Sequence, residues 1–223
     1  MFSEAIGDLL PSALAVALSP VPIIAVVLVL AGPNARIAGP AFALGWVAGL
    51  LAVSAIVVGV LGTGNDPGGD AATGVDWLNV AIGALFLAMA AGQWRKRPGP
   101  GQEPESPGWM ATIDSATPGR ALALGIALSG ANPKNLALTL AASASVAEAG
   151  LDRADTAIAI AVFIALGSVT VVGAVLLHLL APRRAAPPLA AVRQFMSDNN
   201  AAIMTVVLLL IGVKLIGDGV GAL

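Results

Sequence analysis

The middle of the chain contains the stretch Ser129-Gly130-Ala131-Asn132-Pro133-Lys134-Asn135, set inside an otherwise apolar run from Ala121 to Ala147. A lysine near the middle of a bilayer costs roughly 2.5–3.5 kcal/mol on insertion scales, so Lys134 is expected to face a polar interior or a cavity. Pro133 has no N–H to offer the preceding turn, and it biases Asn132 away from helical backbone angles. The stretch therefore predicts a kink or short unwound turn, whose freed backbone groups must be buried in protein or line water.

The composition of the chain is that of a membrane protein. Of its 223 residues, 57% are hydrophobic and 11% are charged, and the mean hydropathy is +0.90. Its apolar runs are long enough to cross a bilayer several times. The net charge of −2 is spread over the loops, so nothing indicates a nucleic-acid partner. The chain has no cysteine and one histidine, which excludes thiolate and histidine-rich metal sites, and we expect no metal and no cofactor.

Six apolar segments are expected to span the membrane, because each is close to the roughly 20 residues that a spanning helix needs. They are Ile6–Leu30, Ile37–Gly62, Val75–Gly92, Arg120–Ala147, Ala157–Ala181 and Ala201–Gly217. The residues before the first segment are acidic where a signal peptide would be basic, so no cleavable signal is expected. The predicted fold class is an all-α integral membrane protein with six transmembrane helices.

Basic residues gather in alternate loops of this plan. They are Arg36 in the first loop, Arg95, Lys96, Arg97 and Arg120 around the third, and Arg183, Arg184 and Arg193 in the fifth. The second loop carries only acidic charges, and the fourth has Arg153 alone among acidic residues. By the positive-inside rule the odd-numbered loops are cytoplasmic and both chain termini lie outside.

Two similar halves flank a linker. Residues 94–119 are rich in proline, glycine and charge and predict a flexible cytoplasmic linker between a first three-helix half, 1–93, and a second, 120–223. Ser19-Pro20-Val21-Pro22 in the first half echoes the Ser129–Pro133 motif in the second. Because three is an odd number, the two halves must sit upside down relative to each other. This is the inverted-repeat plan of many secondary transporters, whose sites lie at broken helices in matching positions.

The proline motif of the first half is the weaker of the two. Pro20 and Pro22 remove two backbone donors, which frees the carbonyls of Val16 and Leu18 from their usual helical partners. A kink that only serves helix packing would explain this motif by itself. Its pairing with Pro133 at the equivalent place in the other half favours a functional site.

The polar residues of the two motifs predict what this site binds. Lys134 supplies a cation, or a base when it gives up its proton. Asn132 and Asn135 offer carbonyl oxygens and N–H donors, and Ser19 and Ser129 offer small hydroxyls suited to unwound turns. The set fits an anionic or zwitterionic group better than a bare metal ion, since every carboxylate lies near the end of a segment or outside it. The alternative is that Lys134 is off-centre and extends to the membrane interface.

Other candidates are weaker. Four hydroxyl residues are expected to pack between helices or to bond their own backbone: Thr139, Ser143, Ser168 and Thr170. Small residues at positions 41, 45 and 49, and again at 84, 88 and 92, predict close helix packing. Lys214 and Asp218 are four residues apart on a helix, which predicts a local ion pair. The sequence contains no nucleophile–base pair, phosphate loop or metal motif, so an enzyme is not expected.

Three stretches together resemble a known family. They are Ser19–Ile23, the Gly-Pro-Asn-Ala-Arg turn ending at Arg36 with the Ala43–Val47 segment it leads into, and Ser129–Leu136. They look like the GAP family of peptidoglycolipid addressing proteins, which includes sulfolipid-addressing proteins and belongs to the lysine exporter (LysE) superfamily. The likeness extends from about Pro11 to Gly217.

The resemblance implies a six-helix protein of the bacterial inner membrane with two inverted three-helix repeats. It also implies that the protein helps to export or deliver a cell-envelope glycolipid. Other branches of the superfamily export amino acids or divalent cations, but the first-helix motif here has two prolines and no acidic residue, which departs from the cation-exporting branch.

Three functions follow as hypotheses. The first is a transporter that holds a lipid head group near the membrane midplane at Lys134 and exposes it to either side in turn. The second is a non-transporting membrane scaffold for a partner in lipid synthesis or export. The third is an exporter of small solutes such as amino acids or cations. In each case the lipid bilayer is the surrounding partner, and the small-residue faces permit a homodimer.

Overall fold

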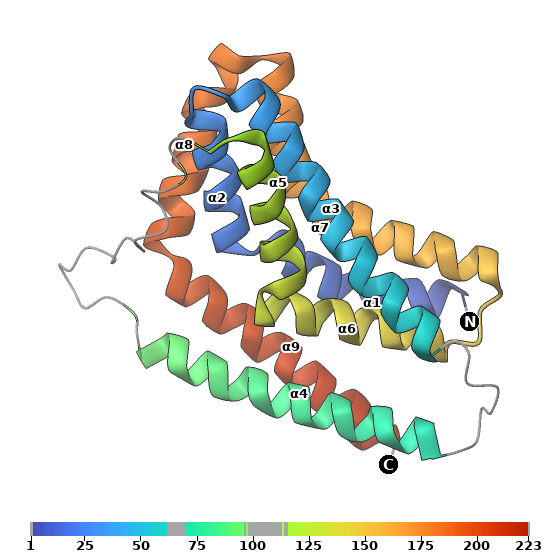
Figure 1. Cartoon of the computed structure of the whole chain (residues 1–223). Helices are drawn as coiled ribbons and strands as arrows, with labels where there is room; N and C mark the ends of the chain where they lie inside the picture. The colour runs from blue at the N-terminus through green and yellow to red at the C-terminus, as the bar shows by residue number, and fades with distance from the viewer. Residues whose placement is uncertain (1, 62–69, 96, 98–112, 114–115, 223) are drawn as a thin grey trace.

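The computed structural model describes residues 2–61, 70–95, 97, 113 and 116–222. Within these residues the regular structure is entirely helical (Figure 1). The elements are α1 (Phe2–Ala17), α2 (Pro20–Ala31), α3 (Ala35–Leu61), α4 (Asp70–Arg95), α5 (Pro118–Ile126), the π-helical turn η2 (Ala127–Ala131), α6 (Pro133–Glu148), α7 (Arg153–Leu180), α8 (Pro182–Asp198) and α9 (Asn200–Ala222).

The chain is a multi-pass membrane protein. Three of its described helices are long and apolar enough to cross a bilayer, α3 over Ala35–Val60, α7 over Arg153–Leu180 and α9 over Asn200–Gly221. The pair α1 and α2, which bends by 49° at its break, makes a fourth span if it is counted as one. The expected first segment is thus broken into two helices. The expected fourth segment is broken as well, into α5, η2 and α6.

The predicted fifth loop is not a loop. Residues Pro182–Asp198 form α8, a helix of 17 residues that packs against α2, α7 and α9. Sequence patterns gave no sign of it, because two adjacent prolines and two adjacent arginines near its start are typical of a loop. A backbone turn at Ala181, with φ −146° and ψ 63°, separates α8 from α7. Most of the predicted linker, 94–119, lies outside the described residues.

The helices pack in matching pairs. α3 lies along α5, and α7 lies along α1. α4 and α9 form the most extensive pair and lie together along one edge of the bundle (Figure 1). α1 also packs against α6. The two chain ends lie at the same end of the bundle in Figure 1, and the side of the membrane on which they lie stays a prediction.

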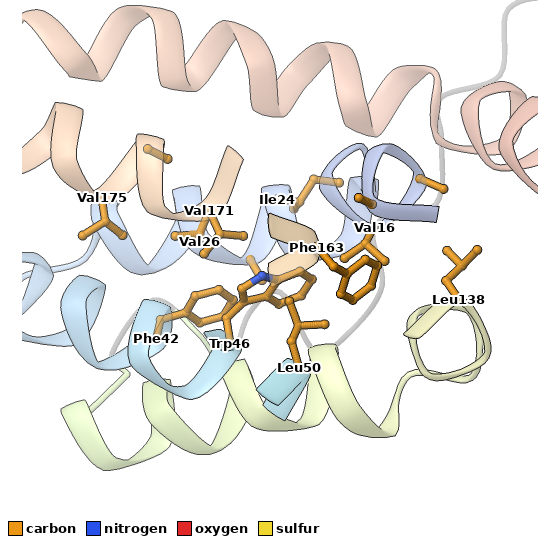
Figure 2. Packing of buried hydrophobic residues seen from close by; sticks show 14 of the residues in the cluster. Val16, Ile24, Val26, Phe42, Trp46, Leu50, Leu138, Phe163, Val171 and Val175 are labelled. Atoms are coloured by element: carbon orange, nitrogen blue, oxygen red, sulfur yellow. The ribbon is translucent and has the colours of Figure 1, made fainter. Parts of the chain in front are cut away.

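The centre of the core is one face of α3. Phe42, Trp46 and Leu50 recur every fourth residue and are fully buried. Figure 2 shows them against Val26 of α2 and Val171 of α7, within a single cluster of buried apolar side chains. Because this face fills the space between α2 and α7, the two halves of the chain share one core.

Glycines bring α3 and α5 into close contact. A Cβ at Gly45 would overlap the carbonyl of Leu122, and a Cβ at Gly125 would overlap the carbonyl of Phe42. A Cβ at Gly49 would overlap the hydroxyl of Ser129. The prediction of close packing at Gly45 and Gly49 is therefore confirmed.

The second small-residue pattern is different from what was expected. A Cβ at Gly92 would meet no atom within 4 Å, so this glycine makes no close helix contact among the described residues. The close approach of α4 to α9 is instead made by Gly83 and Gly212, each of whose Cβ positions would crowd the carbonyl of the other. On α9, the predicted ion pair between Lys214 and Asp218 is confirmed.

Candidate functional site

The two helix breaks have the same backbone geometry. Ser19 precedes α2 with φ −69° and ψ 114°, and Asn132 precedes α6 with φ −69° and ψ 120°. Each is followed by a proline in the first position of the new helix, where the missing N–H would have no helical partner in any case. Pro20 and Pro133 thus end one helix and begin the next, as predicted. Pro22 lies in the first turn of α2.

Of the two carbonyls expected to be free at the first break, that of Val16 has a backbone donor after all. The N–H of Ser19 donates to the carbonyl of Val16 at 3.2 Å and replaces the donor that Pro20 lacks. In a regular helix the same N–H would bond to Ala15, four residues earlier. The carbonyl that lacks its helical N–H donor is therefore that of Ala15 and not that of Val16.

Lys134 supplies a donor to the free carbonyl of Ala15. Its Nζ donates to the carbonyl oxygen of Ala15 at 2.8 Å and to Oγ of Ser19 at 2.7 Å. The lysine is only 3% exposed, so it does not extend to an interface as the alternative required. The ammonium group therefore joins α6 to the broken end of α1, across 119 positions of sequence.

Asn135 completes the connection. Its Oδ1 accepts a hydrogen bond from Oγ of Ser19 at 2.8 Å, and its Nδ2 donates to the carbonyl of Leu128 at 2.9 Å. Leu128 belongs to η2, so the amide side chain also satisfies a backbone acceptor of the second break. We call the group formed by Lys134, Asn135, Ser19 and the Ala15 carbonyl the Lys134 cluster.

A second freed carbonyl is satisfied from α7. Oγ1 of Thr170 donates to the carbonyl of Ala17 at 2.7 Å, next to the first break. This threonine was expected only to pack or to bond its own helix. The sequence signal that could have identified it is its spacing from Gly167, a close-packing residue whose Cβ would lie 3.3 Å from Cγ1 of Val16 in α1.

The other two predicted site residues lie beside the cluster and are not part of it. Oδ1 of Asn132 accepts from the backbone N–H of Lys134 at 3.1 Å, which caps the start of α6. Ser129 donates to the carbonyls of Gly125 and Ile126 in its own helix, at 2.9 and 3.2 Å. The structure thus brings together three of the five predicted residues, Lys134, Asn135 and Ser19.

Of the four weaker hydroxyl candidates, Thr139 does what was expected and bonds the carbonyl of Asn135 in its own helix at 2.8 Å. Several other buried polar atoms near the core have no hydrogen-bond partner among the described residues. They are Nε1 of Trp46 and the hydroxyls of Ser54, Ser143 and Ser168. The interior therefore holds polar groups that the described part of the chain does not satisfy.

The charge of the cluster is unbalanced. Lys134 makes no ion pair with any described residue, and its two acceptors are a carbonyl and a hydroxyl. An ammonium group has three donors, so one donor lacks an acceptor within the described part of the chain. The carbonyl end of α1 favours this cation, while the N-terminal ends of α2 and α6 at the two breaks favour an anion nearby. No group of acidic or histidine side chains suited to a metal ion occurs among the described residues.

These features define a multi-pass helical membrane protein in which two interrupted helices are joined by a buried cationic cluster. Residues 9–221 match the family model described as "Sap, sulfolipid-1-addressing protein", and the chain belongs to this family. No curated protein and no solved structure matches the chain. The resemblance to addressing proteins is thereby confirmed at the level of the family, while membership of the lysine exporter superfamily stays a prediction.

Proposed function

We propose that the protein delivers an envelope lipid with an anionic polar group across the bacterial inner membrane, and that the Lys134 cluster holds that group during passage. The supporting observation is the buried ammonium of Lys134, which has no carboxylate partner and one unused donor among the described residues. A buried charge is costly unless it is paired. An anionic substrate would supply the missing counter-charge and the third acceptor.

Two further features support an anion. The half-helices α2 and α6 both begin at the breaks, and helix N-termini attract negative groups. The description of the family names a sulfolipid, and sulfolipids as a class carry an anionic, sulfur-containing polar group. In this proposal only the polar group enters the protein, while the acyl chains stay in the bilayer, which suits a chain of this size.

We also propose that the six predicted helices form two inverted repeats. In this plan α1 and α2 correspond to α5 and α6, α3 to α7, and α4 to α9. The pairing of α3 with α5 then has its counterpart in the pairing of α7 with α1, and α4 pairs with its own counterpart α9. The matching backbone angles of Ser19 and Asn132 support the same correspondence.

One pair of helices departs from this symmetry. α1 packs against α6, but their counterparts α5 and α2 make almost no direct contact, with α3 lying against both of them. The site is therefore closed at the end where α1 and α6 meet. Alternating access would separate α1 from α6 and bring α2 and α5 together. With both termini outside, the closed end in this structure is the outer one.

The deciding experiment compares the envelope lipids and secreted small molecules of cells with and without the gene. The complementing copy carries either Lys134 or the Lys134→Ala substitution, and its amount in the membrane is measured in parallel. Loss of one anionic surface lipid, restored only by Lys134, is the expected result. Unchanged lipids with accumulation of an amino acid or ion inside the cell would instead identify a small-solute exporter.

The rival function is a scaffold that recruits a lipid synthase or exporter, and the tight packing of the Lys134 cluster favours it as a second candidate. The two functions differ in whether α1 and α6 must separate. The chain has no cysteine, so one cysteine in α1 and one in α6 can be joined by a short thiol cross-linker. Cross-linking should stop delivery by a transporter, whereas a scaffold would work equally well before and after it.

A further inference from the structure

Helix α8 is the one long helix whose role the proposed function leaves open. It runs for 17 residues, or about 25 Å. It lies beside α2 and connects the end of α7 to the start of α9 (Figure 1). In the proposed orientation this is the cytoplasmic end of both helices.

One face of α8 is apolar beyond what the protein covers. Ala185 and Leu189 are buried against the bundle. Val192 and Phe195 are 41% and 57% exposed and lie, with the exposed ring of Pro188, on an adjoining stripe at helical spacing. Leu180, at the end of α7 just before α8, is 84% exposed. The apolar surface of α8 therefore extends beyond the part that the bundle buries.

The start of α8 carries unneutralised positive charge. Arg183 and Arg184 are exposed, and neither side chain forms an ion pair or hydrogen bond with a described residue. The single acidic residue of the helix, Asp198, is at its far end and accepts a hydrogen bond from Gln194 at 2.8 Å. A basic end and an apolar stripe on one exposed helix are typical of a helix that lies on a membrane surface.

The prolines of α8 also indicate that this helix lies at the membrane surface. Pro187 and Pro188 lack the N–H groups that would bond the carbonyls of Arg183 and Arg184. Unsatisfied carbonyls are excluded from the hydrocarbon region but are readily solvated among head groups. The helix is therefore suited to the interfacial layer and unsuited to spanning the bilayer.

We propose that α8 lies in the cytoplasmic head-group layer and binds anionic phospholipid, with Arg183 and Arg184 on the phosphates and Val192 and Phe195 among the upper acyl chains. Anionic head groups of the cytoplasmic leaflet attract basic residues that lie near the membrane surface. The inference rests on the proposed orientation, and it concerns a lipid different from the delivered one. α8 packs on α2, so the helix that binds this lipid contacts a half-helix that begins at the first break.

The first test measures the depth of the apolar stripe. The chain has no cysteine, so Phe195→Cys and Ala190→Cys place single spin labels on different faces of α8 in the full-length protein. In phosphatidylglycerol-containing vesicles, the label at 195 should be reached by oxygen and shielded from a water-soluble nickel reagent. The label at 190 should show the opposite preference. Equal access of the nickel reagent to both sites would overturn the proposal.

The second test measures head-group binding. Adding phosphatidylglycerol to the purified protein in neutral detergent should raise its unfolding temperature by several degrees. Arg183→Gln with Arg184→Gln should remove at least half of that rise. The matched control, Arg95→Gln with Arg97→Gln, removes two positive charges near the end of α4 and should keep most of it.

Two results would overturn the assignment of the ligand. One is an equal loss in both double variants, which would mean diffuse attraction to the whole basic side. The other is an equal rise with inorganic phosphate at the same concentration, which would mean binding of a free anion. Neither test involves delivery through Lys134, so the two proposals can fail separately.

Discussion

The two helix breaks have nearly the same backbone, but only the second one supplies a cation. The first break, around Ser19, contributes the carbonyls of Ala15 and Ala17 as acceptors, and a serine hydroxyl that accepts from Lys134 and donates to Asn135. The second break, around Asn132, contributes the ammonium of Lys134, which donates to Ala15 and Ser19, and the amide oxygen of Asn135, which accepts from Ser19. A proline after an extended residue makes each break, and the side chains that follow it decide its role.

This difference explains how two similar halves form one asymmetric site. If both breaks carried a lysine, two cations would meet in the interior and repel each other. If neither did, the carbonyl of Ala15 would lose its ammonium donor. The observed division pairs the electronegative end of α1 with a cation from the other half and leaves that cation short of one acceptor. The comparison makes four predictions, of decreasing effect.

The largest effect is expected from removing the donor of the second break. Lys134→Met deletes the charge and both hydrogen bonds, each worth about 1.5–3 kcal/mol when one partner is charged. Delivery of the anionic lipid should fall at least tenfold, measured as surface lipid per molecule of protein in the membrane. Lys134→Gln separates charge from hydrogen bonding, because the amide can still donate to Ala15. If the glutamine variant delivers lipid normally, Lys134 only joins α6 to α1 by hydrogen bonds, and the anion-binding role is wrong.

The second prediction compares how tightly each broken helix is held. Gly125→Ala would place a methyl group on the carbonyl of Phe42 and 2.7 Å from the backbone nitrogen of Trp46. Gly167→Ala would place one 3.3 Å from Cγ1 of the Val16 side chain. Overpacking against backbone costs about 1–3 kcal/mol. The unfolding temperature in detergent should fall by several degrees for Gly125→Ala and much less for Gly167→Ala. Equal losses would show that both breaks are supported with the same rigidity.

Much of this architecture could be predicted from the sequence. Apolar length located the helices, and proline chemistry located both breaks, because these signals act within a few residues. The cost of a lysine in the membrane also identified Lys134 as an interior residue. These are local properties, and they need no knowledge of how the helices pack.

The remaining details depend on contacts distant in sequence. Which carbonyl Lys134 binds was set by a one-residue shift in the bond of the Ser19 N–H. The partner of Ala17, Thr170, is 153 positions away, and its local sequence signal is limited to its spacing from Gly167. Ser19 and Ser129 look alike in sequence, yet only the hydroxyl of Ser19 forms a hydrogen bond with a residue of the other half. Helix α8 was missed because its prolines and arginines are typical of loops, and packing against α2 overrides that local preference.

The third prediction tests the two serines directly. Ser19→Ala removes the hydroxyl that links Lys134 to Asn135 but leaves the Lys134 charge and its bond to Ala15, so delivery should fall about three- to tenfold, less than for Lys134→Met. Ser129→Ala removes only bonds within its own helix and should change delivery less than twofold. Surface lipid normalised to membrane protein measures both variants. A larger effect of Ser129→Ala would mean that the second break, and not the connection between the breaks, contacts the substrate.

The smallest effect is expected where the first break is supported without charge. Thr170→Val keeps the shape of the side chain but removes the donor to the Ala17 carbonyl, which should cost about 1 kcal/mol of stability. Thr205→Val is the matched control, because Thr205 donates to Ala201 in its own helix, whose carbonyl keeps its backbone partner. Thermal unfolding in detergent should show a lower temperature for Thr170→Val than for Thr205→Val. Equal unfolding temperatures for the two variants would mean that Thr170 adds no stability and that Lys134 alone holds the end of α1. The first break would then depend entirely on a donor from the second.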